Sequence, residues 1–183
     1  MDDCYIHLRK HPKAHLKVDR GIELKPQDIL RNNHVTRWHI VDTVKTQSVA
    51  EHSFNVAVLA GFLAKKKGLP LQEVTWAALY HDVGEALTGD VPSHLKRVIS
   101  YKDPIEDKLT YLGQKLQTED PKIKEIIKMA DLIDAVHFLD RYGIGIHTEQ
   151  VMSEIAVLIT DQDALELLGK LRSGDPSTLE KVI

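Results

Sequence analysis

The chain has 183 residues, a formal net charge of -3 and 43% hydrophobic residues. This length and apolar content predict a single domain over residues 1–183, and the slight acidic excess argues against a surface that binds nucleic-acid polymers. One cysteine excludes an intramolecular disulfide, and no apolar run approaches the ~20 residues of a membrane span, so we expect a cytoplasmic protein with no membrane partner.

Apolar periodicity, prolines and capping residues predict helices along most of the chain. Residues 1–24 are polar and predict an irregular lead-in, and residues 34–47 show no sustained helical period and predict a loop. Ser48 and Glu51 have the spacing of a capping box, and Gly68 stands where a glycine commonly ends a helix. The predicted helices cover roughly residues 26–33, 49–67, 70–85, 104–116, 121–142, 147–159 and 164–172. No alternating pattern of useful length predicts strands, so the expected fold class is all-α, a compact single-domain helical bundle.

The most informative residues are His81 and Asp82, which lie near the end of the most apolar predicted helix. Adjacent helical residues point about 100 degrees apart, so both can face one point only at a helix end or a kink. Burying an imidazole and a carboxylate costs several kcal/mol unless they form an ion pair or bind a cation. A histidine–aspartate pair taken alone is more often a structural ion pair than a metal site.

Two further residues favour the metal interpretation. His52 begins the preceding core helix, and Asp131 lies among apolar residues of the helix predicted over 121–142. Three helices can thus deliver ligands to one point in the core, which is where helical bundles build metal sites. Two imidazoles and two carboxylates suit a divalent ion, with Zn, Co or Mn preferred and Mg possible, and such an ion activates water for hydrolysis.

The ordered set of His52, His81–Asp82 and Asp131 resembles the signature of the HD-domain phosphohydrolase superfamily. Four segments look like the 5'-deoxynucleotidases of the YfbR branch, and the match spans roughly residues 31–140. They are Arg37–Trp38, Val49–Ser53, Tyr80–Pro92 and Lys128–Asp131. The spacing of the histidines and of the aspartates, with Trp38-His39-Ile40, is more similar to phage dATP triphosphohydrolases of the DatZ type. This resemblance implies removal of phosphates from dATP, in the host cytoplasm if a phage encodes the chain.

The resemblance and the side-chain chemistry together assign roles to residues around the four ligands. Glu85, three positions after Asp82, is expected to be the general acid and base, and the alternative is a solvated glutamate at a helix end. Arg37 is expected to bind phosphate, and the alternative is a surface loop arginine. Trp38 is expected to exclude a 2'-hydroxyl by lying against C2', and the alternative is a core tryptophan.

For four other residues the sequence leaves two interpretations open. Asp90, in a Thr-Gly-Asp turn, either accepts a hydrogen bond from a 3'-hydroxyl or belongs to an ordinary turn. Lys96 either reaches phosphate or is solvated, and Ile40 either crowds the purine edge or simply packs. Asp134, three residues after Asp131, either orients a metal ligand or has a surface or capping role.

The sequence thus predicts a metal-dependent phosphohydrolase of deoxynucleotides, favoured as a dATP/dNTP triphosphohydrolase. The alternatives are a 5'-deoxynucleotidase that releases phosphate from deoxynucleoside monophosphates, and a non-catalytic HD-fold module that binds nucleotides or acts as a scaffold. A degenerate module would be expected to lack a ligand or the acid/base residue, and none is missing. The expected partners are a small-molecule deoxynucleotide and further copies of the chain, since the apolar segment 151–158 offers a surface for a homo-oligomer.

Overall fold

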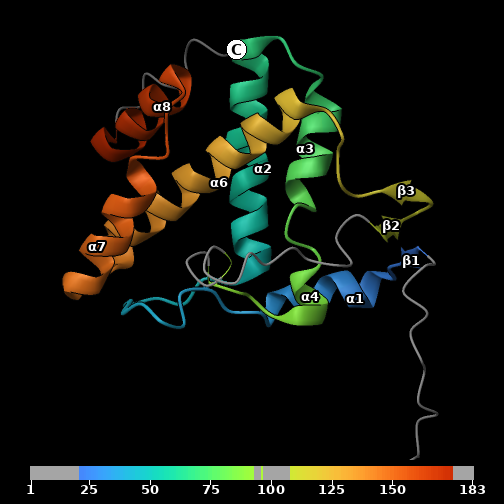
Figure 1. Cartoon of the computed structure of the whole chain (residues 1–183), viewed down its shortest axis with the longest axis horizontal. Helices are drawn as coiled ribbons and strands as arrows, with labels where there is room; N and C mark the ends of the chain where they lie inside the picture. Colours follow the sequence, from blue (N-terminus) through green and yellow to red (C-terminus); the bar gives the residue numbers. More distant parts are fainter. Residues whose placement is uncertain (1–20, 93–95, 97–107, 175–183) are drawn as a thin grey trace, which may run out of the picture.

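The computed structural model describes residues 21–92, 96 and 108–174, and it shows a bundle of helices with a small sheet at one side (Figure 1). The helical fold class expected from the sequence is confirmed. The helical elements are α1 (Pro26–Leu30), the 3-10 helix η1 (Arg31–Asn33), α2 (Val49–Lys67), α3 (Leu71–Leu79), α4 (Glu85–Thr88), α6 (Pro121–Tyr142), α7 (Gly145–Ala156) and α8 (Gln162–Ser173). The strands are β1 (Ile22–Glu23), β2 (Leu109–Tyr111) and β3 (Gln114–Lys115).

Helix α2 is central in the bundle, and both of its ends lie where the sequence predicts. The Ser48 hydroxyl accepts a hydrogen bond from the Glu51 backbone N–H at 3.1 Å, and Gly68 closes the helix in the left-handed region at a φ of 66°. The capping box was also expected to include a reciprocal hydrogen bond from the Ser48 backbone N–H to the Glu51 side chain. That expectation is wrong, because the Glu51 carboxylate accepts from Lys45 Nζ instead. The cap fixes the first turn of α2, and His52 in that turn is fully buried.

The core lies where α6 crosses α2 and α3 packs beside them. In Figure 1, α6 passes diagonally across α2, with α3 on one side and α7 and α8 on the other. Val56 and Leu63 of α2 are fully buried in the same apolar cluster as Ile133 and Val136 of α6. Burying a side chain of this size contributes about 1.5–3 kcal/mol, so this crossing holds the two helices together. Among the helices of the described residues, none combines the length and apolar character needed to cross a membrane.

The small sheet corrects the expectation that the chain has no strands. β1 pairs in parallel with β2, and β2 pairs antiparallel with β3. Leu112 and Gly113 join β2 to β3 with φ values of 54° and 71°, as a two-residue hairpin turn requires. The helix expected over 104–116 is therefore wrong for residues 109–115, and residues 104–107 lie outside the described part. Of the lead-in expected over 1–24, residues 22–23 form β1 and residues 1–20 lie outside the described part.

The end of α3 also differs from the prediction, and this difference shapes the site. α3 stops at Leu79 rather than continuing toward Glu85, because Tyr80 leaves the helical region with φ of -109° and ψ of 10°. His81 and Asp82 therefore lie in the turn between α3 and α4. The Gln117 side chain supports this turn by donating to the His81 carbonyl at 2.9 Å. A pair of adjacent residues can face one point here, as it cannot within a regular helix.

The C-terminal helices begin and end a few residues away from the predicted positions. α7 ends at Ala156 rather than near Ile159, and α8 begins at Gln162 rather than after Asp163. The reason for the early start of α8 is the Asp161 side chain, which accepts a hydrogen bond from the Ala164 backbone N–H at 3.1 Å and so caps the helix.

Candidate metal centre and active site

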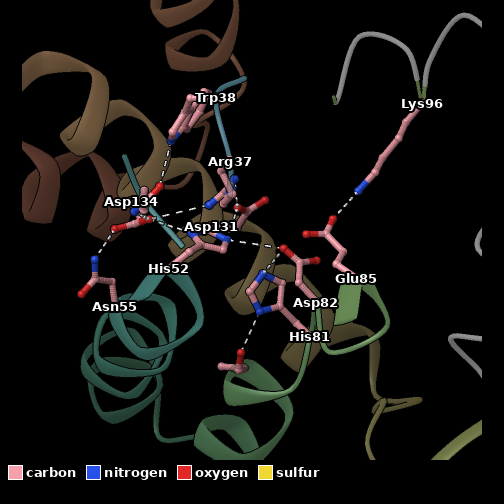
Figure 2. A network of polar contacts seen from close by, with 12 residues as sticks. Arg37, Trp38, His52, Asn55, His81, Asp82, Glu85, Lys96, Asp131 and Asp134 are labelled. Carbon is pink, nitrogen blue, oxygen red and sulfur yellow. Dashed lines mark hydrogen bonds and ion pairs between the residues drawn. The ribbon is translucent and has the colours of Figure 1, made fainter. Parts of the chain in front are cut away.

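Two histidines and two aspartates from three parts of the chain meet at one end of α2 (Figure 2). His52 belongs to α2, His81 and Asp82 to the turn after α3, and Asp131 to α6. His52 Nε2 lies 3.1 Å from Asp131 Oδ1 and 3.5 Å from Asp82 Oδ2. His81 Nε2 lies 3.2 Å from Asp82 Oδ2. Of the four side chains that the sequence singled out as metal ligands, His52, His81 and Asp131 offer ligand atoms within 4.8 Å of one another, and Asp82 lies beside the two histidines.

Each imidazole is held so that its Nε2 atom faces this common point. His52 Nδ1 lies 2.6 Å from Asp134 Oδ2, and His81 Nδ1 lies 2.7 Å from the carbonyl oxygen of Ala78. An oxygen acceptor at Nδ1 places the proton there and leaves the Nε2 lone pair free. Both Nε2 atoms are buried, and neither has a hydrogen-bond partner in the described part of the chain. Such lone pairs beside two carboxylates fit a divalent cation, whose binding would compensate the cost of burying them.

The charges around His52 favour a cation at this point. Burial and the Arg37 charge lower the pKa of His52, but the three neighbouring carboxylates outweigh both and raise it to about 10. Those carboxylates belong to Asp82, Asp131 and Asp134. Burial raises the pKa of Asp82, yet the two histidines hold it well below its usual value, and the pKa of Asp131 is lowered for similar reasons. The three carboxylates thus favour positive charge at this point, and a cation bound by the same groups would supply it.

Glu85 begins α4 beside this cluster and is only 6% exposed, so it is not the solvated glutamate that was the alternative for this position. Lys96 Nζ donates to its Oε1 at 3.2 Å, while its Oε2 is buried without a hydrogen-bond partner among the described residues. Burial raises the pKa of Glu85 to about 8, with Asp82 adding to the rise and Lys96 opposing it. A carboxyl group that titrates near neutral pH suits proton transfer in both directions.

Arg37 and Trp38 lie on the loop before α2, and Arg37 points into the cluster (Figure 2). The guanidinium lies 3.8 Å from Asp131 Oδ1 and 3.9 Å from Asp134 Oδ2. It also lies 5.1 Å from the centre of the Trp38 ring, which in turn stacks nearly parallel to Phe138 at 6.0 Å. Arg37 is therefore not a surface loop arginine, and its fork of donors is held where phosphate oxygens could bind.

Asp134 is buried behind His52 and accepts hydrogen bonds from two amide side chains. Gln47 Nε2 donates to Oδ2 at 2.9 Å, and Asn55 Nδ2 donates to Oδ1 at 2.9 Å. Of the two interpretations of Asp134, the structure shows the contact that orients His52 rather than a surface position. Sequence reasoning missed Gln47 and Asn55. Gln47 lies in a loop without periodicity, and the only signal for Asn55 is its place one turn after His52 on the same helix.

The remaining predicted residues lie at the edge of the cluster. Asp90 Oδ2 lies 3.5 Å from Nδ1 of His39, a residue that the sequence did not single out for a contact. Lys96 is paired with Glu85, so a phosphate would have to share or replace that carboxylate as its partner. Ile40 is 54% exposed and stays outside the polar cluster.

Comparisons with known proteins point to one family. The family described as 5'-deoxynucleotidase YfbR-like matches residues 27–111. The dATP triphosphohydrolase of Acinetobacter phage SH-Ab 15497 is 37% identical over 141 residues, which cover 66% of this chain and 69% of that protein. The dATP triphosphohydrolase of Salmonella phage PMBT28 is 33% identical over 134 residues, covering 67% of this chain and 69% of that protein. The solved structure of the Cyanophage S-2L HD phosphohydrolase (DatZ), bound to dA and one catalytic Zn2+ ion, is 26% identical with a TM-score of 0.63, covering 86% of this chain and 98% of that chain.

Proposed function

Because the chain belongs to the YfbR-like branch of the HD phosphohydrolases, we propose that it is a metal-dependent triphosphohydrolase acting on dATP and other deoxynucleoside triphosphates. One observation carries the proposal. Two buried imidazole nitrogens without hydrogen-bond partners in the described residues converge on the same point as two carboxylates, next to a buried glutamate. This arrangement combines a place for a cation with a group that can transfer protons, as metal-assisted hydrolysis requires.

The residues that would hold the metal are His52, His81, Asp82 and Asp131. A divalent ion bound there supplies a water of lowered pKa and polarises a phosphoryl oxygen. We infer Zn, Co or Mn ahead of Mg, because a mixed set of two imidazoles and two carboxylates suits a divalent ion of intermediate hardness. The Zn2+ ion described for DatZ agrees with this preference.

The other residues of the site would act on the substrate itself. Arg37, already directed at Asp131, would bind phosphate oxygens through its fork of donors. In the favoured reaction the water oxygen bonds to the α-phosphorus, the bond to the 5'-oxygen breaks, and the 5'-oxygen takes up a proton while tripolyphosphate leaves. Glu85, with a pKa raised to about 8, would accept the proton of the water and return one to the leaving oxygen. Lys96, 3.2 Å from Glu85, would keep that carboxyl group in place.

Sugar and base selection would depend on the loop before α2. We infer that the rigid Trp38 ring lies against C2' of the sugar and leaves no room for a 2'-hydroxyl. Asp90 would accept a hydrogen bond from the 3'-hydroxyl, and its contact with His39 holds it in place for this role. Ile40, which is 54% exposed, would contact the purine edge from the surface of the site.

A second candidate function is that of a 5'-deoxynucleotidase, and the match of the YfbR-like family to residues 27–111 favours it. The two reactions need the same metal and acid, and both break the bond between the α-phosphorus and the 5'-oxygen. They differ in whether the site accepts a triphosphate or a monophosphate on the 5'-oxygen. The decisive experiment is chromatography of the products formed from deoxy- and ribonucleoside mono- and triphosphates with Mn or Co added, with His81→Ala as the inactive control.

Tripolyphosphate from dATP would support the triphosphohydrolase, whereas inorganic phosphate from dAMP would support the nucleotidase. If wild-type protein leaves every nucleotide intact, a non-catalytic nucleotide-binding module replaces both. We also infer a homo-oligomer, because large apolar side chains at the end of α7 are exposed, with Val157 at 74% and Leu158 at 43%. Light scattering at several protein concentrations tests that inference.

A further inference from the structure

Gln47 is a fully buried side chain that joins Trp38 to Asp134. Its Oε1 accepts a hydrogen bond from Trp38 Nε1 at 2.8 Å, and its Nε2 donates to Asp134 Oδ2 at 2.9 Å. A bridge between an indole N–H and a carboxylate needs one acceptor and one donor at the end of the same side chain. Of the natural side chains, the primary amide provides both in fixed geometry.

The Asp134 end of this bridge reaches the metal centre. The same Oδ2 atom that accepts from Gln47 lies 2.6 Å from His52 Nδ1. A hydrogen bond at Nδ1 fixes the tautomer and the ring orientation of a metal-binding histidine. Gln47 thus contacts the atom that orients His52, although none of the hydrogen bonds among the described residues joins Gln47 to the His52 ring itself.

At the other end of the bridge, Trp38 has an unusual backbone conformation. Trp38 has a φ of 64°, in the left-handed region that residues with a side chain rarely adopt. Gln47 also holds the residue before it, because the Gln47 backbone oxygen accepts from the Arg37 backbone N–H at 2.9 Å. The Trp38 ring is further supported by stacking on Phe138. The orientation of the indole therefore depends on Gln47 as well as on ring stacking.

We propose that Gln47 is a positioning residue that couples Trp38 to His52 through Asp134, so that sugar discrimination and metal binding depend on one buried amide. The proposal rests on the proposed function for the role of Trp38 at the sugar. The coupling itself is a property of the folded chain and exists without substrate. A contact at the sugar that reorients the indole would, through Gln47, also change the hydrogen bonding of His52.

The test uses a Trp76→Phe background, in which Trp38 is the only tryptophan of the chain. Two substitutions of similar size are compared in it. Gln47→Met removes both ends of the bridge, whereas Asn55→Leu removes the other amide donor to Asp134, which has no contact with Trp38. Acrylamide quenching of the metal-free protein reports the exposure of Trp38, and the absorbance of bound Co2+ reports the metal affinity.

We expect Gln47→Met to increase Trp38 quenching and to lower the Co2+ affinity by about tenfold, at the low end of losses for residues that orient metal ligands. Asn55→Leu should lower the affinity similarly and leave the quenching unchanged. If Gln47→Met leaves either readout unchanged, the coupling is overturned. It is equally overturned if Asn55→Leu increases the quenching as much, because the effect would then be general loosening. Should Gln47→Met not fold, Trp38→Phe replaces it, and an unchanged Co2+ affinity in that variant overturns the coupling.

A third readout links the coupling to selectivity. Gln47→Met should reduce the preference for 2'-deoxyadenosine over adenosine in competition binding by about fivefold, the effect of one lost neutral hydrogen bond. An unchanged preference would overturn the part of the proposal that concerns the sugar. Quenching and metal binding are measured without nucleotide. A protein that shows the expected changes in both but hydrolyses no nucleotide would therefore retain the coupling while the proposed function fails.

Discussion

Replacing Asp134 with asparagine is the sharpest test of how the metal centre is oriented. Asp134→Asn keeps the shape of the side chain and removes its charge. The asparagine oxygen can still accept from His52 and Gln47 if it takes the place of Oδ2, and the Asn55 amide must then flip to accept from the new N–H group. The site stays hydrogen-bonded, so the change measures the contribution of the negative charge behind His52.

The magnitude follows from the bond at His52 Nδ1. A hydrogen bond to a charged group contributes about 1.5–3 kcal/mol and a neutral one about 1 kcal/mol, a difference of roughly 0.5–2 kcal/mol, or about 2- to 30-fold in affinity. Losses for residues that orient metal ligands are typically about 10- to 100-fold. The ranges overlap at about 10- to 30-fold, and we expect Asp134→Asn to weaken Zn2+ binding by that factor.

Isothermal titration of chelator-treated protein with Zn2+ measures this change. The matched control is Asp140→Asn, the same substitution on the same helix, at a residue that pairs with Arg172 and is 38% exposed at its side chain. The control should bind Zn2+ like the wild type. Equal affinities of Asp134→Asn and the wild type would refute the argument that Asp134 orients His52 for a metal.

Three further predictions follow from the site and the packing. Glu85→Gln should lower kcat for the preferred nucleotide by about 10²- to 10⁴-fold, the usual contribution of a general acid or base, with the metal affinity measured in parallel as the control that should change little. Zn2+ at about 1,000 times its Kd should raise the free energy of unfolding by about 4 kcal/mol and Tm by roughly 8–16 °C; a His81→Ala protein that gained as much would contradict the ligand set. Gly143→Ala should destabilise the fold by about 1–3 kcal/mol, because its Cβ would lie 2.1 Å from Thr148 Cγ2 and 2.6 Å from the Leu139 carbonyl oxygen. The control is Gly169→Ala at an exposed position of α8, where an added Cβ would have no atom within 4 Å and should stabilise the helix by about 0.5–1 kcal/mol. Thermal unfolding that ranked the two variants in the opposite order would refute the packing argument.

The long helices were predictable because their end signals are local. Ser48 and Gly68 bound α2, and Pro121 and Gly143 bound α6, at the residues that the sequence indicates. Caps and prolines act on backbone groups within one turn, so their effect can be read without knowledge of the fold.

The hairpin could not be predicted in the same way. Leu112 adopts a positive φ that is normally left to glycine or asparagine, so the two-residue turn has only Gly113 as its sequence signal. β2 is held by pairing with Ile22–Glu23, which lie far earlier in the chain. Pairing between distant segments leaves no periodic pattern in a strand of three residues, and the apolar residues of this stretch fit a helix equally well.

The residues of the candidate site also differ in how well the sequence predicts them. The four candidate ligands and Glu85 were found because charged residues stand out in apolar helices. The groups that orient the histidines were not all visible, because they depend on which atoms meet after folding. The group that orients His81 is the backbone carbonyl of Ala78, and a backbone carbonyl gives no signal in the sequence. Gln47 is an ordinary loop residue until the fold places it between Trp38 and Asp134.

The geometry of the ligand set also depends on residues that lie far from it. α2 carries His52, α3 leads into His81, and the two helices pack closely at Gly61, where an added Cβ would lie 3.1 Å from Thr75 Cγ2 and 3.3 Å from Leu71 Cδ1. A side chain at position 61 would require these two side chains of α3 to give way by a few tenths of an ångström. The separation of the two imidazoles, whose ring centres lie 5.1 Å apart, is therefore fixed by helix packing as much as by hydrogen bonds. Because a cation needs its ligands within a few tenths of an ångström of their bonding distances, this close approach contributes to metal binding although Gly61 contacts none of the ligands.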